Sequence, residues 1–445
     1  MSTGESGVVD SMPRARSGID GDVRQAPSYP GAGVSQSAPG DGGSRDGGQL
    51  NWPAIAEPGN TPSAVELVDR IIDLAIERRA TDIHVDPHGD QLRVRVRIDG
   101  MLHDIHAMPV SVATEIVSRL KVLGGIDIIE HRHPQDGHFT RQHGGREVDF
   151  RVATAPVLGG EKVVVRILPG DRVLTGTANL GMEEAQLQVV RNLIAHPYGM
   201  LLATGPVGSG KTTTLYALLN DINTSSRNVM TIEDPVEYRL PGINQMQTDP
   251  RASFGFAEGL RAILRQDPNV VMVGEIRDEE TATTAFKAAM TGVLVFSTLH
   301  TKDAPGSVDS LVGLSVARFM IAGALIGVIA QRLLRRICPH CREEYRPADE
   351  LLKKIDAAET LGGKPLFHGK GCEHCFQTGY RGRTGAFEIM VITEPIRDAI
   401  LRVARPSELR RLIAQGGIQW LRQSAWSKVL AGITTPEEYL RVVFT

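Results

Sequence analysis

The sequence has few cysteines and little net charge, and each shortage excludes a class of protein. Only four cysteines occur in 445 residues, all between Cys338 and Cys375. This excludes a disulfide-rich secreted scaffold and favours a reducing compartment with a local metal site. The formal net charge is −3 at pH 7, so no overall basic field points to nucleic acid. A basic stretch interleaved with aromatic residues, as in binders of single strands, is also missing.

The sequence also lacks a signal peptide and a clear membrane span. No basic start followed by an apolar core occurs at the N-terminus, so no secretory leader is expected. The most apolar stretch, residues 311–330, carries Arg318, and an arginine at the centre of a membrane costs about 2.5–3.5 kcal/mol or more. We therefore expect a pair of buried helices in this stretch, and a cytoplasmic protein.

Residues 1–60 show no sustained apolar period. They contain 12 glycines, 8 serines and 6 prolines, and such a segment buries too little surface to offset the entropy of ordering it. We expect a disordered tail. The rest of the chain is too long for one ordinary domain, and a hydrophobic content of 41% is enough for real cores. Two further domains are expected, over residues 61–178 and 179–445.

The first of these domains is expected to be small and of the α+β class. Thr61 is placed as the N-cap of a helix that runs to about residue 79, because apolar residues recur there at helical spacing. Strands are expected where apolar and polar residues alternate between turn signals such as Asp99-Gly100. These predicted strands are residues 92–98, 148–153 and 162–168.

The segment from Gly205 to Thr212 fits the phosphate-binding loop pattern G-x-x-x-x-G-K-[ST]. An apolar run before it is typical of a buried strand, and the residues after it favour a helix. Glycines let backbone N–H groups curl around a phosphate, and the helix N-terminus adds positive charge. Lys211 is expected to reach the β- and γ-phosphates of ATP, and the Thr212 hydroxyl to bind Mg²⁺. The predicted ATP-binding residues are Gly205, Pro206, Val207, Gly208, Ser209, Gly210, Lys211, Thr212 and Thr213.

Three more apolar runs, residues 228–233, 270–273 and 293–297, are typical of buried strands. Strands that alternate with helices around a phosphate loop predict a parallel sheet with helices on both faces. The carboxyl ends of such strands are where these sheets bind ligands.

Acidic and histidine side chains follow the three runs. Glu233 would orient or deprotonate the water that attacks the γ-phosphate, or form a surface acidic turn. Gly274 stands where a Walker B aspartate usually ends the strand. Glu275 would therefore interact either with the Mg²⁺ or with the attacking water. His300 would sense the γ-phosphate or serve as a satisfied structural group.

The cysteines form two C-x-x-C pairs. Four thiolates complete a tetrahedral zinc shell and leave no open position, so the zinc would be structural. Four buried or free thiols are the alternative, and His340 and His374, inside the pairs, could compete as ligands. The predicted zinc ligands are Cys338, Cys341, Cys372 and Cys375.

Taken together and in this order, the motifs resemble the type II secretion and type IV pilus assembly ATPases (the GspE/PulE/PilB family), from about residue 61 onward. Eight stretches of the family pattern have counterparts in this chain. In chain order they are A-S-D-I-H-I-E-P at residues 80–87, R-V-S-T-x-P at 151–156, G-E-x-V-V-x-R at 160–166, E-D-P-x-E at 233–237, L-R-Q-D-P at 264–268, G-E-I-R-D at 274–278, A-Q-R-L at 330–333 and G-Y-x-G-R at 379–383. The zinc-type segment favours the secretion or pilus-extension branch, because pilus-retraction relatives lack it.

The resemblance implies an α/β fold: a RecA-like P-loop ATPase domain, a preceding small α+β domain, a zinc-binding insertion at residues 338–375 and a helical tail at residues 387–445. It also implies a hexameric ring. Arg151 and Arg166 match arginines that reach the phosphates, an arginine-finger role. Glu233 matches the water-orienting carboxylate, Glu275 the Walker B glutamate and His300 the second histidine of the His box. Which glutamate is the base stays open.

The chain departs from the family pattern at three positions. Val293, Lys302 and Asn269 replace histidine, asparagine and aspartate, changes that would slow turnover or alter coupling. Secretion members also carry a folded N-terminal domain that binds a membrane-anchored partner. Only the Gly/Ser/Pro-rich tail precedes residue 61 here, so docking is expected to use other surfaces.

We therefore expect a homohexameric, Mg²⁺-dependent ATPase that powers pseudopilus assembly and protein export in type II secretion. It would sit at the cytoplasmic face of the inner membrane, attached peripherally through platform proteins. A type IV pilus extension ATPase is the alternative, and a nucleic-acid translocase or a weakly hydrolysing assembly subunit are alternatives of another class. The basic cluster of Arg332, Arg335 and Arg336 would touch an acidic partner or lipid headgroups, or be a solvated helix end.

Overall fold

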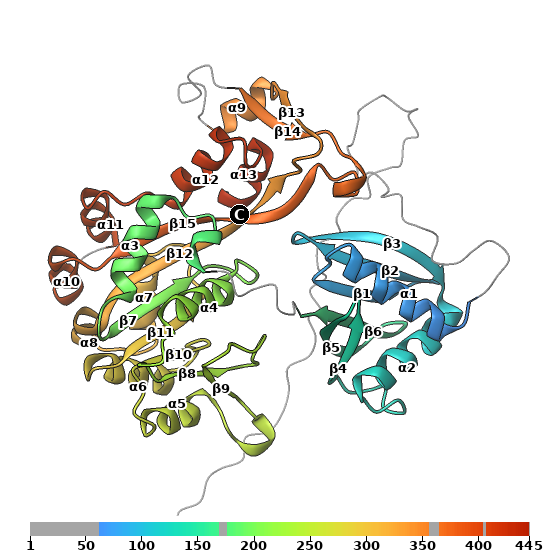
Figure 1. The fold of residues 1–445 in the computed structure, drawn as a ribbon, viewed down its shortest axis with the longest axis horizontal. Helices are drawn as coiled ribbons and strands as arrows, with labels where there is room; N and C mark the ends of the chain where they lie inside the picture. The colour runs from blue at the N-terminus through green and yellow to red at the C-terminus, as the bar shows by residue number, and fades with distance from the viewer. Residues whose placement is uncertain (1–61, 169–175, 356–364, 404–405, 445) are drawn as a thin grey trace, which may run out of the picture. The chain divides into compact units, whose positions relative to one another are not determined.

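The computed structural model describes residues 62–168, 176–355, 365–403 and 406–444 (Figure 1). The predicted disordered tail, residues 1–60, lies outside the described residues, as does Thr61. Residues 62–168 and residues 176–444 each build their own main sheet, and the two parts are described separately.

Residues 62–168 form a six-stranded antiparallel sheet with two helices packed on it. The strand order is β3-β2-β1-β6-β5-β4. Strict alternation along β2 buries Leu92, Val94 and Val96 in a core with the apolar stripe of α1, which is the usual result of a period-two pattern. The elements are α1 (Ala64–Glu77), β1 (Asp82–His88), β2 (Gln91–Ile98), β3 (Met101–Pro109), η1 (Val110–Val112), α2 (Ala113–Gly124), β4 (Gln135–His143), β5 (Arg146–Val157) and β6 (Gly160–Ile167).

The three strands predicted in this part are confirmed, but the predicted helix start is wrong by two residues. Ser63, not Thr61, caps α1. The Ser63 hydroxyl accepts a hydrogen bond from the Glu66 amide (3.3 Å), and the Glu66 carboxylate accepts one from the Ser63 amide (2.9 Å). This reciprocal capping box satisfies two backbone donors, whereas a single threonine cap satisfies one.

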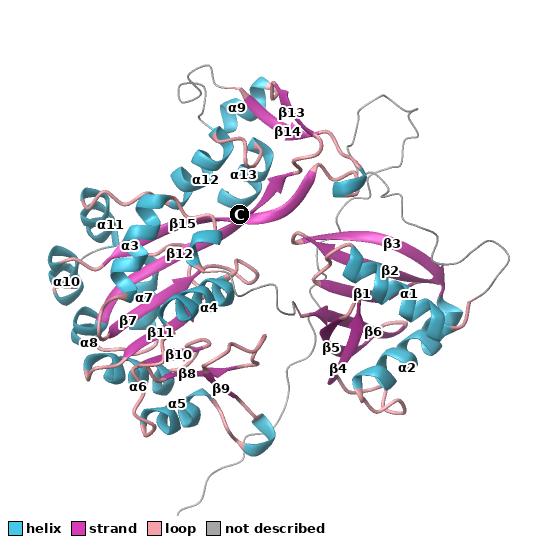
Figure 2. Cartoon of the chain, viewed as in Figure 1, coloured by secondary structure: helices cyan, strands magenta, loops and turns pink. Residues whose placement is uncertain are grey.

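Residues 176–444 contain a seven-stranded sheet in the order β15-β12-β7-β11-β10-β8-β9. Neighbouring strands are parallel except for β12 and β15. Helices lie on both sides of this sheet (Figure 2). The elements are η3 (Thr177–Asn179), α3 (Glu184–Ile194), β7 (Gly199–Thr204), α4 (Lys211–Ile222), β8 (Val229–Glu233), β9 (Asn244–Gln247), η4 (Pro250–Ala252), α5 (Phe256–Leu264), β10 (Val270–Val273), α6 (Glu279–Met290), β11 (Leu294–Leu299), α7 (Gly306–Gly313), α8 (Arg318–Ala324), β12 (Leu325–Ile337), β15 (Tyr380–Val391), α10 (Glu394–Leu401), α11 (Pro406–Gln415), α12 (Leu421–Leu430) and α13 (Pro436–Val443).

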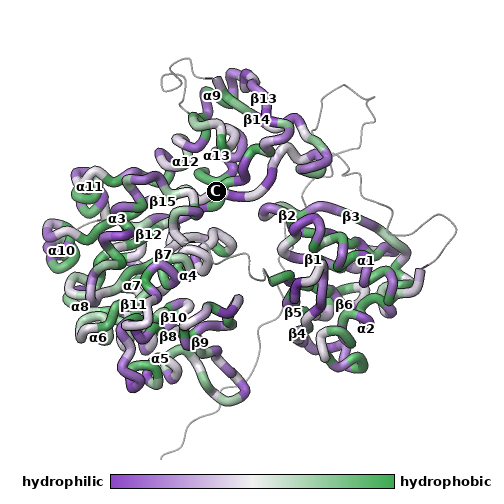
Figure 3. The backbone as a smooth tube through the Cα atoms, in the orientation of Figure 1, coloured by the Kyte–Doolittle hydropathy of each residue, from purple (hydrophilic) through white to green (hydrophobic). Residues whose placement is uncertain are grey.

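The central strands explain why the sequence shows continuous apolar runs there. Every residue of β7, β8, β10 and β11 is buried, because the two faces of the sheet face two separate hydrophobic cores. The peripheral helices α10 and α11 instead carry both hydrophobic and hydrophilic residues (Figure 3). The predicted parallel sheet with a helix on each side is therefore confirmed.

The prediction of a buried helix pair over residues 311–330 is only partly right. The stretch contains the end of α7 and all of α8, but from Leu325 onward it forms β12, a 13-residue strand. An apolar run gives no period that separates a buried strand from a buried helix, and pairing with β7 on one side and β15 on the other settles it. Within the described segments, no helix is long and apolar enough to cross a membrane.

The cysteine-containing segment and the tail follow β12. β13 (Arg342–Tyr345) and β14 (Leu366–Gly369) form a small antiparallel sheet beside α9 (Asp349–Ile355) and η5 (Glu373–Cys375). The segment expected to be a helical tail starts inside β15 and becomes helical only after Val391. Its last helix, α13, is capped by Thr435, whose hydroxyl accepts a hydrogen bond from the Glu438 amide (3.2 Å).

Candidate functional site

The glycine loop joins β7 to α4 at the carboxyl end of the parallel strands, as predicted. Gly205 has φ = 148° and Gly210 has φ = 90°, backbone conformations that side chains other than glycine rarely adopt. A Cβ on Gly205 would lie 2.6 Å from the Gln331 carbonyl oxygen. The loop therefore presses directly on the neighbouring strand β12, and only glycine fits there.

Lys211 lies under this loop. Its ammonium donates hydrogen bonds to the carbonyls of Gly205 (2.9 Å) and Pro206 (3.2 Å). Burial lowers the pKa of Lys211 to about 8, and the nearby Glu275 carboxylate counteracts part of that decrease. Ser209 and Thr214 each have a buried hydroxyl without a hydrogen-bond partner among the described residues. Ser209 belongs to the loop itself, where a phosphate would satisfy its hydroxyl, so this residue fits the predicted ATP.

His300 and Glu275 come together with Lys211. The His300 Nδ1 lies 3.4 Å from the Lys211 Nζ, and the His300 Nε2 lies 3.6 Å from the Glu275 Oε2. Arg277 pairs with Glu275 and lies 3.8 Å from Asp234. We call Lys211, His300, Glu275, Arg277 and Asp234 the strand-end cluster. Its members follow β7, β11, β10 and β8, so parallel pairing of distant segments is what assembles the cluster.

Glu233 lies at the end of β8 but forms a separate network. It is 2% exposed, and its carboxylate accepts hydrogen bonds from the Tyr216 hydroxyl, the Thr231 hydroxyl (2.6 Å) and the Gln245 amide (3.1 Å). Burial raises the pKa of Glu233, and the Thr231, Tyr216 and Gln245 donors offset part of that increase. It is therefore not the surface acidic turn that was the alternative interpretation.

Tyr216, which no sequence motif marks, contacts Glu233 from the helix that carries Lys211. Burial and the Glu233 carboxylate raise the pKa of Tyr216, which keeps its hydroxyl protonated as a donor. A tyrosine on the buried face of an apolar helix resembles ordinary core. Only its pairing with a strand-end carboxylate marks it, and that pairing is not visible in the sequence.

Arg151 and Arg166 lie directly opposite each other on the antiparallel strands β5 and β6. Opposite residues of such a pair share one face of the sheet, so the structure brings the two predicted arginine fingers together. Arg166 also forms an ion pair with Asp82 of β1 (3.1 Å). That either arginine reaches a phosphate stays a prediction.

The A-Q-R-L motif lies on β12 beside the glycine loop. Gln331 is 1% exposed, and its amide donates to the Ser209 carbonyl (2.8 Å). Arg332 donates to the carbonyls of Gln331 (3.1 Å) and Lys302 (2.8 Å). Arg332 thereby connects β12 to the segment that follows His300.

The three basic residues of this cluster lie on a strand, so the interpretation as a solvated helix end is wrong, whereas contact with an acidic partner or lipid headgroups stays a prediction. Arg335 forms an ion pair with the fully buried Glu438 of α13 (2.8 Å), Arg336 is exposed, and Arg332 donates to the carbonyls of Gln331 and Lys302. Arg335 and Arg336 have different surroundings because successive residues of a strand point to opposite sides.

Val293 does not lie near the phosphate loop. It precedes β11, whereas His300 follows the last residue of that strand, so the six residues of β11 separate Val293 from the strand-end cluster by about 20 Å. Val293 packs at the edge of the hydrophobic core instead. A direct effect of Val293 on the bound phosphates is therefore not expected.

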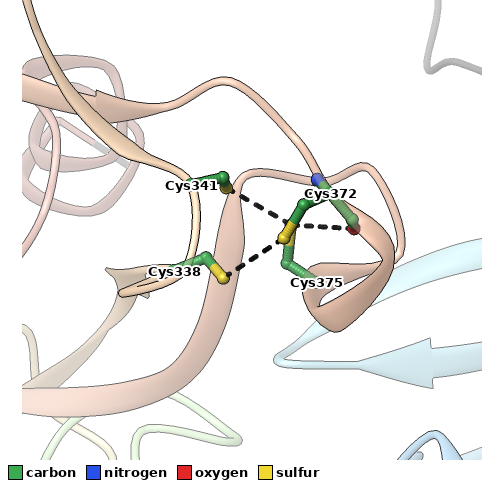
Figure 4. A group of neighbouring side chains, drawn as sticks. All are labelled: Cys338, Cys341, Cys372 and Cys375. Atoms are coloured by element: carbon green, nitrogen blue, oxygen red, sulfur yellow. Dashed lines mark hydrogen bonds between the residues drawn. The ribbon is translucent and has the colours of Figure 1, made fainter.

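The four predicted zinc ligands converge from two loops (Figure 4). All four Sγ atoms lie within 4.8 Å of one another. The separations are 3.8 Å for Cys338 and Cys372, and 3.7 Å for Cys375 with both Cys341 and Cys372. Four sulfurs placed about 2.3 Å from a tetrahedral zinc would be about 3.8 Å apart, so the cluster fits zinc closely.

Backbone groups around the cysteines support the same interpretation. The Cys375 sulfur accepts hydrogen bonds from the amides of Cys372 (3.2 Å) and Gly379 (3.3 Å), and such donors stabilise a metal-bound thiolate. The rings of His340 and His374 contact each other at a tilt of 32°, with centroids 4.0 Å apart, and neither belongs to the cluster of possible ligands among the described residues.

Comparison with known proteins adds a family to this geometry. Residues 59–441 match the family described as "Type II/IV secretion system protein". The type II secretion system protein E of Dickeya dadantii is 45% identical over 378 residues, which are 85% of this chain and 75% of that protein. The type IV pilus assembly ATPase PilB of Thermus thermophilus is 42% identical over 379 residues, which are 85% of this chain and 43% of that protein.

Solved structures show the same fold. The ATPase DotB of Legionella pneumophila superposes with a TM-score of 0.63 at 23% identity, over 87% of this chain and 98% of that chain. The pilus retraction motor PilT, solved with bound ADP, superposes with a TM-score of 0.57 at 27% identity, over 86% of this chain and 97% of that chain. The fold is thus that of the RecA-like secretion ATPases.

Proposed function

This chain belongs to the type II/IV secretion system protein family and is a secretion ATPase, and from that premise we propose that it is the motor that drives pseudopilus assembly in type II secretion. Extension of a type IV pilus is the alternative, because relatives of both kinds match over the same length. The observation that supports ATP hydrolysis best is the strand-end cluster, in which Lys211, His300 and Glu275 meet beside the glycine loop.

The roles follow from position and charge. Lys211 and the loop amides would bind the β- and γ-phosphates, and Thr212, half-buried at the second position of α4, would hold Mg²⁺. When bound, Mg²⁺ neutralises charge on the phosphate oxygens. Glu275 lies near enough to Lys211 to counteract the decrease in its pKa, which suits the magnesium-side role.

Glu233 suits the role of proton acceptor. A general base works best with a pKa nearer to neutrality than that of a free carboxylate, and burial raises the pKa of Glu233. His300 is half exposed and lies between Lys211 and Glu275, so it would respond to the γ-phosphate. Arg151 and Arg166 would supply the arginine fingers in an assembled ring.

The proposed assembly is a homohexamer that associates with inner-membrane platform proteins and needs no transmembrane helix of its own. Zinc bound by the four cysteines would fix the segment between β12 and β15. No described residue suggests nucleic acid as a partner, and the net charge of −3 opposes it. Co-purification of the chain with its membrane partners would identify the system that it serves.

The test of the proposed reaction is steady-state ATP turnover with Mg²⁺. Glu233→Gln and Glu275→Gln should each lower kcat by about 10²-fold or more while ATP binding persists. Glu279→Gln, which changes an exposed carboxylate in the first turn of α6, should leave kcat unchanged. Wild-type turnover in both active-site variants would refute the proposal. Stimulation many-fold by single-stranded DNA would favour a translocase instead.

A further inference from the structure

The segment that follows His300 is bound to more elements than a surface loop requires. We call residues 301–306 the post-histidine loop. The Thr301 amide donates to the Thr204 hydroxyl at the end of β7 (2.9 Å), and the hydroxyls of these two threonines lie 2.6 Å apart. The Lys302 backbone carbonyl accepts a hydrogen bond from the Arg332 guanidinium of β12 (2.8 Å). The beginning of the loop is therefore fixed to the two strands that frame the nucleotide site.

The other end of the same loop is fixed to the C-terminal helices. The Asp303 carboxylate accepts hydrogen bonds from the Gly306 amide (2.8 Å) and from Arg410 of α11 (2.6 Å). The Ala304 amide donates to Glu388 of β15 (2.9 Å). Six residues thus connect the nucleotide site to a helix far along the chain.

Glu388 is the centre of these contacts. It is 2% exposed and has no ion pair among the described residues. One carboxylate oxygen accepts from the Ala304 amide, and the other accepts from the Leu421 amide at the start of α12 (3.1 Å). A buried carboxylate is costly unless hydrogen bonds satisfy it, so these two bonds fix the loop and α12 on opposite sides of one rigid group.

Charged side chains of both signs lie near Glu388, although none forms an ion pair with it among the described residues. Arg410 and Arg332 are near enough to interact with its charge, and Asp303 repels it. A displacement of the post-histidine loop would change all of these distances together. Because the loop begins next to His300, the charge at the γ-phosphate position and the position of α12 depend on the same buried group.

We propose that Glu388 is a positioning residue for the ATPase reaction, which holds His300 at the nucleotide and transmits the nucleotide state to the C-terminal helices α11 and α12. Glu388 touches neither substrate nor cofactor, and it acts through the post-histidine loop. The inference rests on the proposed function, because it needs ATP to bind beside Lys211 and His300.

The test uses Glu388→Gln in the full chain. Glutamine keeps the shape but replaces one acceptor with a donor, so one of the two backbone amides loses its partner. We expect kcat to fall about tenfold, the effect of losing one hydrogen bond to a charged group, with KM for ATP changed less than about twofold. Hydrogen exchange of the α12 amides should slow in wild type when a non-hydrolysable ATP analogue binds, and should not respond to the analogue in Glu388→Gln.

Glu394→Gln is the matched control, since Glu394 is an 85% exposed carboxylate on α10, and it should behave as wild type in both measurements. Arg410→Gln serves if Glu388→Gln fails to fold, because Arg410 is half exposed and its ion-pair partner Asp303 is itself partly exposed. It should reduce the analogue's effect on exchange in α11. Wild-type kcat and wild-type exchange responses in Glu388→Gln, or in Arg410→Gln where that variant replaces it, would overturn the inference.

The proposed function can fail separately. If Lys211→Ala and Glu275→Gln leave ATP turnover at the wild-type rate, the proposed reaction is wrong whatever Glu388 does. If those two variants lose turnover while Glu388→Gln keeps both kcat and the exchange response, only the positioning role is wrong.

Discussion

At the scale of single residues, the contact between Gly205 and Gln331 can be tested by adding one methyl group. Gly205→Ala places a Cβ 2.6 Å from a backbone oxygen, whereas Gly208→Ala meets nothing within 4 Å although its φ is 76°. Both substitutions place a side chain at positive φ, which destabilises the fold by about 1–2 kcal/mol. Only Gly205→Ala also displaces β12. We expect Gly205→Ala to lower thermal stability more and to abolish ATP binding, as measured by thermal unfolding and nucleotide titration. Equal effects of the two variants would contradict the contact.

Tyr216 controls the proton affinity of Glu233. Burial raises the pKa of Glu233, and the Tyr216 hydroxyl opposes that increase by stabilising the ionised carboxylate, so Tyr216→Phe should raise the pKa of Glu233 further. A base acts only when deprotonated, so kcat decreases as pH falls through this pKa. The decrease should therefore begin at higher pH in the variant, which a pH profile of kcat measures.

The neighbouring Tyr238 provides the control for that profile. Its ring packs edge-on against Tyr216, and its buried hydroxyl has no hydrogen-bond partner among the described residues. Tyr238→Phe should leave the acid limb of kcat where it is in wild type. If both variants shift the limb equally, the effect comes from ring packing and not from the Tyr216 hydroxyl.

At the scale of elements, local sequence patterns predict much of the fold, but they do not reveal contacts between elements that are distant in the sequence. A pattern of only a few residues is enough to identify the glycine loop, the central strands and the two C-x-x-C pairs. The prediction of helix for β12 is wrong because β12 pairs with two strands, β7 and β15, that the local apolar pattern does not reveal. Glu388 and Tyr216 were missed for the same reason, since the groups that they contact come from distant elements.

The cysteine cluster gives a prediction for the element that it closes. Cys372→Ser should remove the bound zinc, about one ion per chain, and lower thermal stability, because the core between β14 and α12 is adjacent. His374→Ala, which lies outside the sulfur cluster, should retain zinc. Metal analysis of both purified variants checks this. Full zinc content in Cys372→Ser would mean that the histidines serve as ligands.

At the scale of the whole molecule, the small domain should matter for turnover only through its paired arginines. Arg151→Gln and Arg166→Gln should each lower kcat by about 10³-fold if they act as arginine fingers. Arg146→Gln, at the exposed start of the same strand as Arg151, should not. Turnover is measured at chain concentrations where size-exclusion chromatography shows the same oligomeric state for the variants and wild type, so that a loss of assembly is not mistaken for a loss of chemistry.

The length of β12 has a mechanical consequence. One strand begins in register with β7, passes the glycine loop at Gln331 and ends at Ile337, immediately before Cys338. At about 3.3 Å per residue, Gln331 and Cys338 are about 23 Å apart. β12 is paired with β15 along most of its length and with β7 at its start, so a displacement at Gln331 would be carried along the strand to Cys338. A tilt of about 5° at Gln331 would move the cysteine cluster by about 2 Å.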